Sequence, residues 1–168
     1  MEKVWDKIDY SSTGPDYTDF VKPDIAVYST QGTSYSTPVV TGMAACLWQM
    51  DSTLTNFEII ELFQKAGNFY PYPNNYLGYG VPTCEEILKV YNQQERESPR
   101  VIHTQKDAVV IKVPKEVKYT VAFHKRDSIH VLHRNIYRQS GKLKIKKVEE
   151  ASQTSILMDT KVIEIFWE

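Results

Sequence analysis

Hydrophobic periodicity changes once along this 168-residue chain, near residues 93–99. Before this point apolar residues recur at helical spacing, and after it they alternate with polar residues as in strands. Charge changes sign at the same place: residues 1–99 hold six Lys or Arg against thirteen Asp or Glu, whereas residues 100–168 hold fourteen against eight. We therefore predict two units, 1–92 and 100–168, joined by a polar linker at 93–99.

The first unit is predicted to contain strand and loop material up to residue 28, followed by three helices. Apolar residues spread over most of the helical circumference between Ser34 and Met50, so we expect this helix to be buried nearly all round. Pro38 is expected within its first turn or so, where a missing N–H costs little. Two Thr-x-x-Glu capping boxes predict shorter helices at 55–66, ended by a glycine, and at 83–91.

The second unit is predicted to be a small all-β domain with a hairpin tip at 124–127. Its period-two segments predict strands at 108–113, 119–123, 128–132, 142–145 and 162–167. Its basic excess is compatible with an anion or nucleic-acid surface, but we interpret the lysines as protection of solvated strand edges, because they are scattered and no aromatic pattern accompanies them.

The two cysteines, Cys46 and Cys84, are too few for a disulfide framework and lack metal-ligand spacing. We interpret both as free, buried small hydrophobes, with a disulfide or a reactive thiol as the alternative. No apolar run reaches the ~18 residues of a membrane span. Residues 1–6 do not have the basic flank and apolar core of a signal peptide.

The segment 32–42 holds the main candidate for chemistry and reads Gly-Thr-Ser-Tyr-Ser-Thr-Pro-Val-Val-Thr-Gly. A serine at a helix start is usually an N-cap. Here Gly32 permits a sharp turn just ahead of the helix. The backbone amide of Ser34 would then lie at the positive end of the helix dipole, where it can stabilise an anion.

The flanking sequence favours the catalytic interpretation. Residues 11–15 read Ser-Ser-Thr-Gly-Pro, residues 21–25 read Val-Lys-Pro-Asp-Ile, and residues 77–82 read Leu-Gly-Tyr-Gly-Val-Pro. Together with the segment 32–42, these blocks resemble, in order, motifs of the subtilisin-like serine proteases (subtilases, peptidase S8). The resemblance covers residues 11–91.

This resemblance implies an α/β fold: the C-terminal portion of the subtilase parallel-sheet fold, followed by the small all-β domain. It implies that Ser34 is the catalytic nucleophile of a serine endopeptidase and that Gly32 and Thr33 contribute to substrate binding. By family, the protein would be a secreted or cell-envelope protease of bacterial type that cleaves polypeptides. No cofactor is expected, although calcium is possible in the family.

The sequence departs from the family pattern in two ways. Only residues 26–31 separate the Lys-Pro-Asp-Ile block from Gly32, a short loop for this position. No histidine precedes Ser34, and Asp16, Asp19 and Asp24 lack the family's catalytic-aspartate context, so we interpret these three as turn acids. The catalytic Asp, His and oxyanion Asn would lie N-terminal to Met1.

The four histidines all follow residue 99, and we interpret them as exposed strand or turn residues, with metal binding as the alternative; they are His103, His124, His130 and His133. The chain alone is therefore expected to be inactive, and its expected partner is the missing N-terminal part of the catalytic domain. The second hypothesis is a non-catalytic subtilase remnant whose β domain is a binding module. No nucleic acid is expected as a partner.

Overall fold

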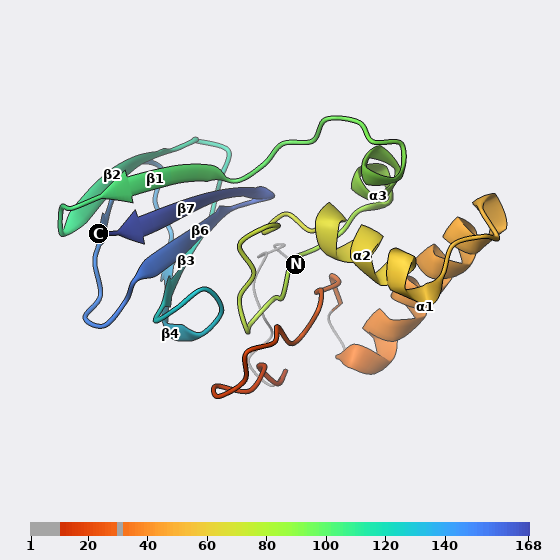
Figure 1. Ribbon diagram of the computed structural model, residues 1–168. Coiled ribbons are helices and arrows are strands. Elements are labelled where there is room, and N and C mark those ends of the chain that lie inside the picture. Colours follow the sequence, from red (N-terminus) through yellow and green to blue (C-terminus); the bar gives the residue numbers. More distant parts are fainter. Residues whose placement is uncertain (1–10, 30–31) are drawn as a thin grey trace. The chain divides into compact units, whose positions relative to one another are not determined.

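The computed structural model describes residues 11–29 and 32–168, which form two compact units (Figure 1). One unit lies within Lys7–Glu97, and the other contains Ser98–Glu168. Residues 1–6, which were compared with a signal peptide, and the end of the short loop at 26–31 lie outside the described residues. Helices occur in the first unit and two sheets in the second, so the fold is mixed α/β.

The described part of the first unit holds three helices: α1 (Thr33–Met50), α2 (Asn56–Ala66) and α3 (Cys84–Tyr91). The strand material predicted ahead of α1 is wrong for residues 11–29, which form turns, bends and irregular backbone. Within the described part of this unit the only β pairing is an isolated bridge between Asn74 and Gly78. Its contribution to a parallel sheet therefore stays a prediction.

Helix α2 confirms its sequence signals. The Thr55 hydroxyl accepts from the Glu58 amide at 3.2 Å, and the Glu58 carboxylate accepts from the Thr55 amide at 2.7 Å. This reciprocal capping box satisfies two donors that a helix start leaves free. The face formed by Ile59, Phe63 and Ala66 is buried. In α3 only half of the predicted box forms, because the Glu86 carboxylate turns to Lys89 and Arg96 instead of the Thr83 amide.

Helix α1 does not have the predicted burial. Leu47 is its one buried residue, and Val40, Met43 and Ala44 on the same side pack with it against residues of α2 and α3. The other side is exposed, including Val39. The described part of this unit offers α1 one packing surface, and helical periodicity cannot tell which sides of an apolar helix are covered. Both cysteines are free and exposed, so their predicted burial is also wrong.

Arg96 fixes the segment that was predicted to be a linker. Its guanidinium donates to the carbonyls of Lys65, Ala66 and Gly67 at the end of α2, with a distance of 2.9 Å to Gly67. Its Nε also lies 3.4 Å from the Glu86 carboxylate. A cation at a helix C-terminus satisfies free carbonyls and complements the helix dipole. The predicted linker at 93–99 is therefore anchored to the helical unit through Arg96.

The second unit is built from seven strands in two sheets (Figure 1). A five-stranded sheet has the order β1-β7-β6-β3-β4, in which β1 and β7 are parallel and the other neighbours antiparallel. Strands β2 and β5 form a separate antiparallel ribbon. The strands are β1 (Arg100–Thr104), β2 (Ala108–Val113), β3 (Thr120–Lys125), β4 (Val131–Tyr137), β5 (Gly141–Lys146), β6 (Gln153–Met158) and β7 (Lys161–Trp167).

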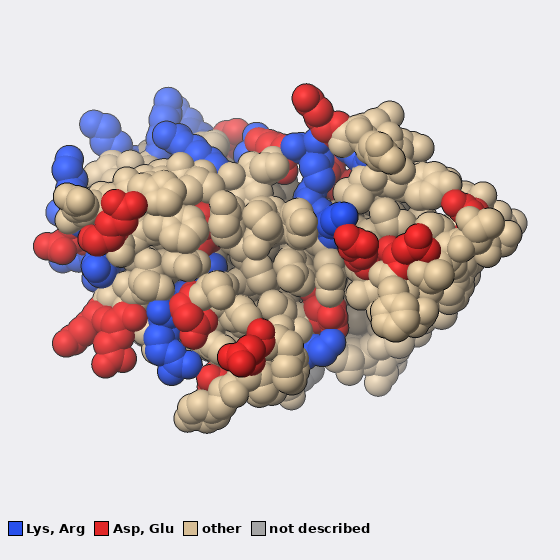
Figure 2. All heavy atoms as spheres, viewed as in Figure 1, with Lys and Arg blue, Asp and Glu red and all other residues tan. Residues whose placement is uncertain are grey.

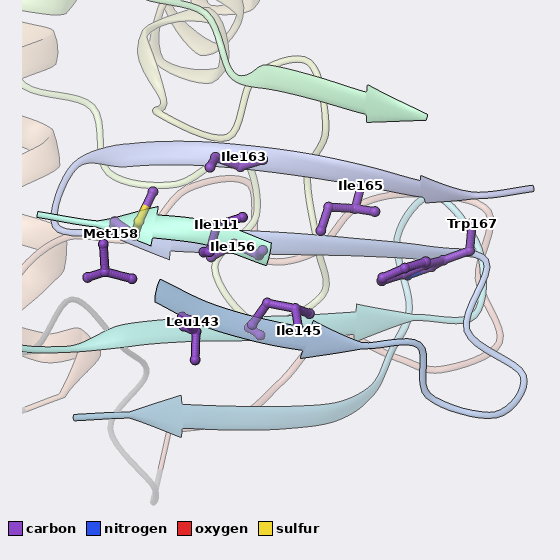
Figure 3. Packing of buried hydrophobic residues seen from close by; sticks show 10 residues of the cluster. Ile111, Leu143, Ile145, Ile156, Met158, Ile163, Ile165 and Trp167 are labelled. Atoms are coloured by element: carbon purple, nitrogen blue, oxygen red, sulfur yellow. The ribbon is translucent and has the colours of Figure 1, made fainter. Parts of the chain in front are cut away.

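The core of this unit lies between the sheet and the ribbon (Figure 3). Strands β2 and β5 alternate between exposed and buried residues from Val110 and Lys142 onward, with Ile111, Val113, Leu143 and Ile145 buried in this core. Their alternation is what made these strands predictable. The sheet contributes the remaining buried members, which are Ala122, Ile156, Met158, Ile163, Ile165 and Trp167.

Strand β3 is buried along its whole length, through residues that were predicted to form a hairpin tip. The strand continues through His124 and Lys125, so 124–127 is not a hairpin tip. Lys125 is fully buried and lies 2.8 Å from the Glu164 carboxylate on β7. Strands β1 and β6 were not predicted, and the strand predicted at 128–132 instead starts at Val131. No helix in the described part of the chain is long and apolar enough to cross a membrane.

Candidate active site

Ser34 is the second residue of α1, directly after a sharp backbone turn. Gly32 is the N-cap, with φ of 82° and ψ of −176°. This φ is readily available only to glycine, which explains the residue type at this position. No side chain caps the helix start. Among the described residues, the Ser34 amide therefore has no acceptor and is available to an incoming group.

The Gly32 carbonyl accepts three hydrogen bonds in the first turn of α1. It accepts from the amides of Tyr35 at 3.1 Å and Ser36 at 3.3 Å, and from the Ser36 hydroxyl at 3.4 Å. Ser34 is exposed, and the described residues offer its side chain no hydrogen-bond partner. Its amide precedes the first helical hydrogen bonds, at the positive end of the helix dipole. The two serines of the motif therefore have different surroundings.

Pro38 lies deeper in α1 than the sequence suggested, as the sixth residue of the helix. A residue with an N–H at this position would donate to the Ser34 carbonyl, four residues earlier. Proline cannot make that bond. The turn that carries Ser34 is therefore held by hydrogen bonds to the carbonyls of the two preceding residues. The Gly32 carbonyl accepts as described above, and the Thr33 carbonyl accepts from the Thr37 hydroxyl at 2.9 Å.

The other three sequence blocks meet in one network of loops. The Gly14 amide donates to the Asn75 carbonyl at 2.7 Å. The Tyr79 amide donates to the Asp24 carbonyl at 2.9 Å, and the Ala26 amide donates to the Gly80 carbonyl at the same distance. Segments more than fifty residues apart thus pair through backbone groups, immediately before the chain enters α1.

Two glycines are required by this close approach. A Cβ at Gly14 would lie 1.7 Å from the Lys22 carbonyl oxygen. A Cβ at Gly78 would lie 2.2 Å from the Pro23 carbonyl oxygen and 2.3 Å from that of Asp24, and Gly78 also has φ of 61°. Separations this short are impossible for real atoms, so any side chain would force the blocks apart. The glycines of the motifs therefore serve their mutual packing.

The acids near this network bind neighbouring amides. The Asp16 carboxylate accepts from the Asn75 side chain at 3.1 Å, and the Asp24 carboxylate accepts from Gln64 at 3.0 Å and from Lys22. Their environment is that of loop acids, as their sequence context suggested. Buried Asn74 accepts from the amides of Tyr76 and Leu77 at 2.9 Å each.

None of the four histidines lies in the unit that carries Ser34. His124 is buried on β3, contrary to the prediction of an exposed residue. Its Nδ1 lies 3.0 Å from the Thr154 hydroxyl, and its Nε2 accepts from the Asn135 amide at 3.3 Å. Burial, and then the nearby His133, lower the pKa of His124 to about 4.

His130 is also mostly buried and follows the turn that begins at Asp127. Its Nδ1 lies 2.8 Å from the Asp127 carboxylate, which also accepts from the amides of Ile129 and His130. Burial raises the pKa of Asp127, but these hydrogen bonds outweigh it and hold the pKa at about 2. His103 and His133 are exposed as predicted. Within residues 11–29 and 32–168 no three His, Cys, Asp or Glu are placed to hold a metal.

Comparison with known families agrees with the converging sequence blocks. The model of the subtilase family (peptidase S8) matches residues 6–80, which include the loop network, Ser34 and the helices α1 and α2. No curated protein and no solved structure matches the chain. Residues 6–80 are therefore similar to the subtilases, a family of serine peptidases.

Proposed function

We propose that this chain supplies the nucleophile of a subtilisin-like serine endopeptidase and that Ser34 is that nucleophile. The observation that carries the proposal is its position: an exposed serine in the first turn of α1, directly after Gly32-Thr33, inside the matched family segment. In this proposal Gly32 and Thr33 bind the substrate backbone beside the scissile bond.

The proposed reaction is peptide hydrolysis through an acyl-enzyme. The Ser34 hydroxyl attacks the scissile carbonyl while a histidine takes its proton, and the leaving amine then receives that proton. The Ser34 amide, at the positive end of α1, donates to the oxyanion of the tetrahedral intermediate. Both groups of Ser34 that this reaction uses, the hydroxyl and the backbone amide, are available among the described residues.

The histidine, the aspartate that orients it and the oxyanion asparagine would come from a polypeptide segment outside residues 11–97. Residues 1–99 contain no histidine. The exposed side of α1 supports such a partner, because Tyr35, Val39 and Met50 leave apolar surface there for another part of a catalytic domain to cover. As part of the same proposal, residues 1–92 form the C-terminal portion of a subtilase catalytic domain.

Without that partner the 168-residue chain is expected to hydrolyse no peptide through Ser34. Loss of triad members lowers turnover of serine proteases by on the order of 10⁴–10⁶. The test combines the chain, fused or mixed, with a polypeptide that carries subtilase Asp and His motifs. Peptide hydrolysis should then appear, Ser34→Ala should abolish it, and Ser36→Ala should leave most of it.

Ser36→Ala is the matched control, since its hydroxyl makes one long hydrogen bond to Gly32 and its loss should cost ~1 kcal/mol at most. An active Ser34→Ala protein would reject the assignment. By family, the completed enzyme would be secreted or located at the cell envelope. The second candidate function is non-catalytic binding by residues 100–168, and it is favoured by the separation of every histidine from the unit of Ser34.

A further inference from the structure

The ribbon formed by β2 and β5 has a strongly basic outer face. Its inner side chains enter the core, and its outer side chains include the exposed lysines Lys112, Lys142, Lys144 and Lys146. The sequence suggested scattered lysines, but the structure aligns these four on one face. Figure 2 shows blue side chains gathered at the part of the molecule where Figure 1 places β2. Neither strand contains an Asp or Glu.

The arrangement of the lysines is electrostatically unfavourable within the ribbon. Lys112 lies directly opposite Lys142 in the strand register. Like charges at opposite positions of an antiparallel pair destabilise the sheet. In the described part of the chain none of these lysines pairs with a carboxylate. The ribbon thus presents four positive charges that no carboxylate of the described residues neutralises.

Protection against edge-to-edge aggregation does not require so many lysines. Strands β1 and β4, the edges of the five-stranded sheet, carry one Lys or Arg each, Arg100 and Arg134. Charged side chains, lysines above all, discourage pairing at an exposed edge. The ribbon carries four, three of them on β5 alone. Strand β5 therefore carries a higher density of positive charge than either edge of the five-stranded sheet.

Strand β5 also has a free edge. It pairs only with β2, and no further backbone hydrogen bond from 141–146 occurs among the described residues. Side chains at every second residue of a strand are spaced by ~6.7 Å, and directly opposite side chains lie ~5 Å apart. An extended chain added along β5 would therefore place every second side chain beside Lys142, Lys144 or Lys146.

We propose that the edge of β5 binds an extended polypeptide segment with Asp or Glu at alternate positions, which adds as a third strand. Backbone hydrogen bonds to the free edge would supply affinity, and the lysine row would select the acidic sequence. A nucleic acid fits less well, because the face has no arginine and no aromatic ring on which bases could stack. This binding does not depend on Ser34 or on proteolysis.

The test measures fluorescence anisotropy of a labelled peptide, Glu-Thr-Glu-Thr-Glu-Thr-Glu, with the intact 168-residue chain at low salt. Replacing the three β5 lysines by glutamine should weaken binding about tenfold, since three exposed ion pairs are lost. A charge-matched control replaces Lys65, Lys89 and Lys115 by glutamine and should change affinity less than about threefold. All six side chains are largely solvent-exposed or half-buried, so circular dichroism can verify folding.

Two further peptides test the strand geometry. A peptide of the same composition with its four glutamates contiguous, and an alternating peptide N-methylated on every second amide, should both bind clearly less. The proposal is overturned if the alternating peptide does not bind, if the control triple variant weakens binding as much as the β5 variant, or if either altered peptide binds equally well. Equal affinity for single-stranded DNA of the same charge would replace it with a general polyanion surface.

Discussion

Substituting Gly78 by alanine tests whether the family's sequence blocks really pack against each other. The added Cβ would lie 2.2 Å from the Pro23 carbonyl oxygen and 2.3 Å from that of Asp24. An L-residue at φ of 61° costs about 1–2 kcal/mol. Separating the two segments also breaks the 2.9 Å bond from the Tyr79 amide to Asp24, worth about 1 kcal/mol. We expect a total loss of about 2–3 kcal/mol.

Gly42→Ala is the matched control, because Gly42 lies within α1 and a Cβ there meets nothing within 4 Å. Alanine in a helix interior is more favourable than glycine by about 0.5–1 kcal/mol, so this variant should be slightly more stable. Urea unfolding followed by far-UV circular dichroism reports on the unit that holds all three helices. The reasoning is refuted if Gly78→Ala lies within 0.5 kcal/mol of the parent, a margin of about the usual error.

Three further predictions concern charged and titratable groups. Arg96→Gln should lower the stability of the helical unit by about 1–3 kcal/mol, because the carbonyls at the end of α2 lose a charged donor; an unchanged urea midpoint would contradict this. Glu164→Gln should cost about 3–5 kcal/mol by leaving buried Lys125 unpaired, and adding Lys125→Met should recover part of that loss; no recovery would argue against the pair. His124 has a pKa of about 4 in the folded chain and ~6.5 in the unfolded chain. Its contribution to the free energy of unfolding is therefore complete above pH 6.5 and declines by up to about 3 kcal/mol toward pH 4. His124→Gln should flatten this decline when unfolding is measured as a function of pH.

The sequence predicted those helices and strands whose pattern is contained within the element itself. Helix α2 has both partners of its capping box three residues apart, and its buried face repeats at helical spacing. Strands β2 and β5 alternate because one side meets the core and the other meets water. In each case one element contains the whole pattern, so the sequence alone was sufficient.

The incorrect predictions concern properties that depend on distant residues. Strand β3 is covered on both sides, which removes its alternation and buries His124 and Lys125 in positions that looked like a polar turn. The burial of α1 depends on which surfaces are present to cover it. The four lysines of the ribbon are separated by up to 34 positions, and only the register of β2 with β5 places them on one face.

The candidate site shows the same division. The segment around Ser34 was identified from its own residues and from the blocks that flank it. Its contact partners were not, because the pairing of Gly14 with Asn75 and of Asp24 with Tyr79 joins loops that are far apart in sequence. The glycines marked these positions as special, but only the structure identifies what each one approaches.

The most direct test of the account is the location of a covalent probe. The purified chain is treated with a fluorophosphonate, with and without a polypeptide that carries subtilase Asp and His motifs, and the modified residue is located by mass spectrometry. We predict no labelling of the chain alone, because no histidine activates Ser34, and stoichiometric labelling of Ser34 in the completed enzyme. Labelling of the chain alone at Ser34, or of Ser36 in the completed enzyme, would contradict the account.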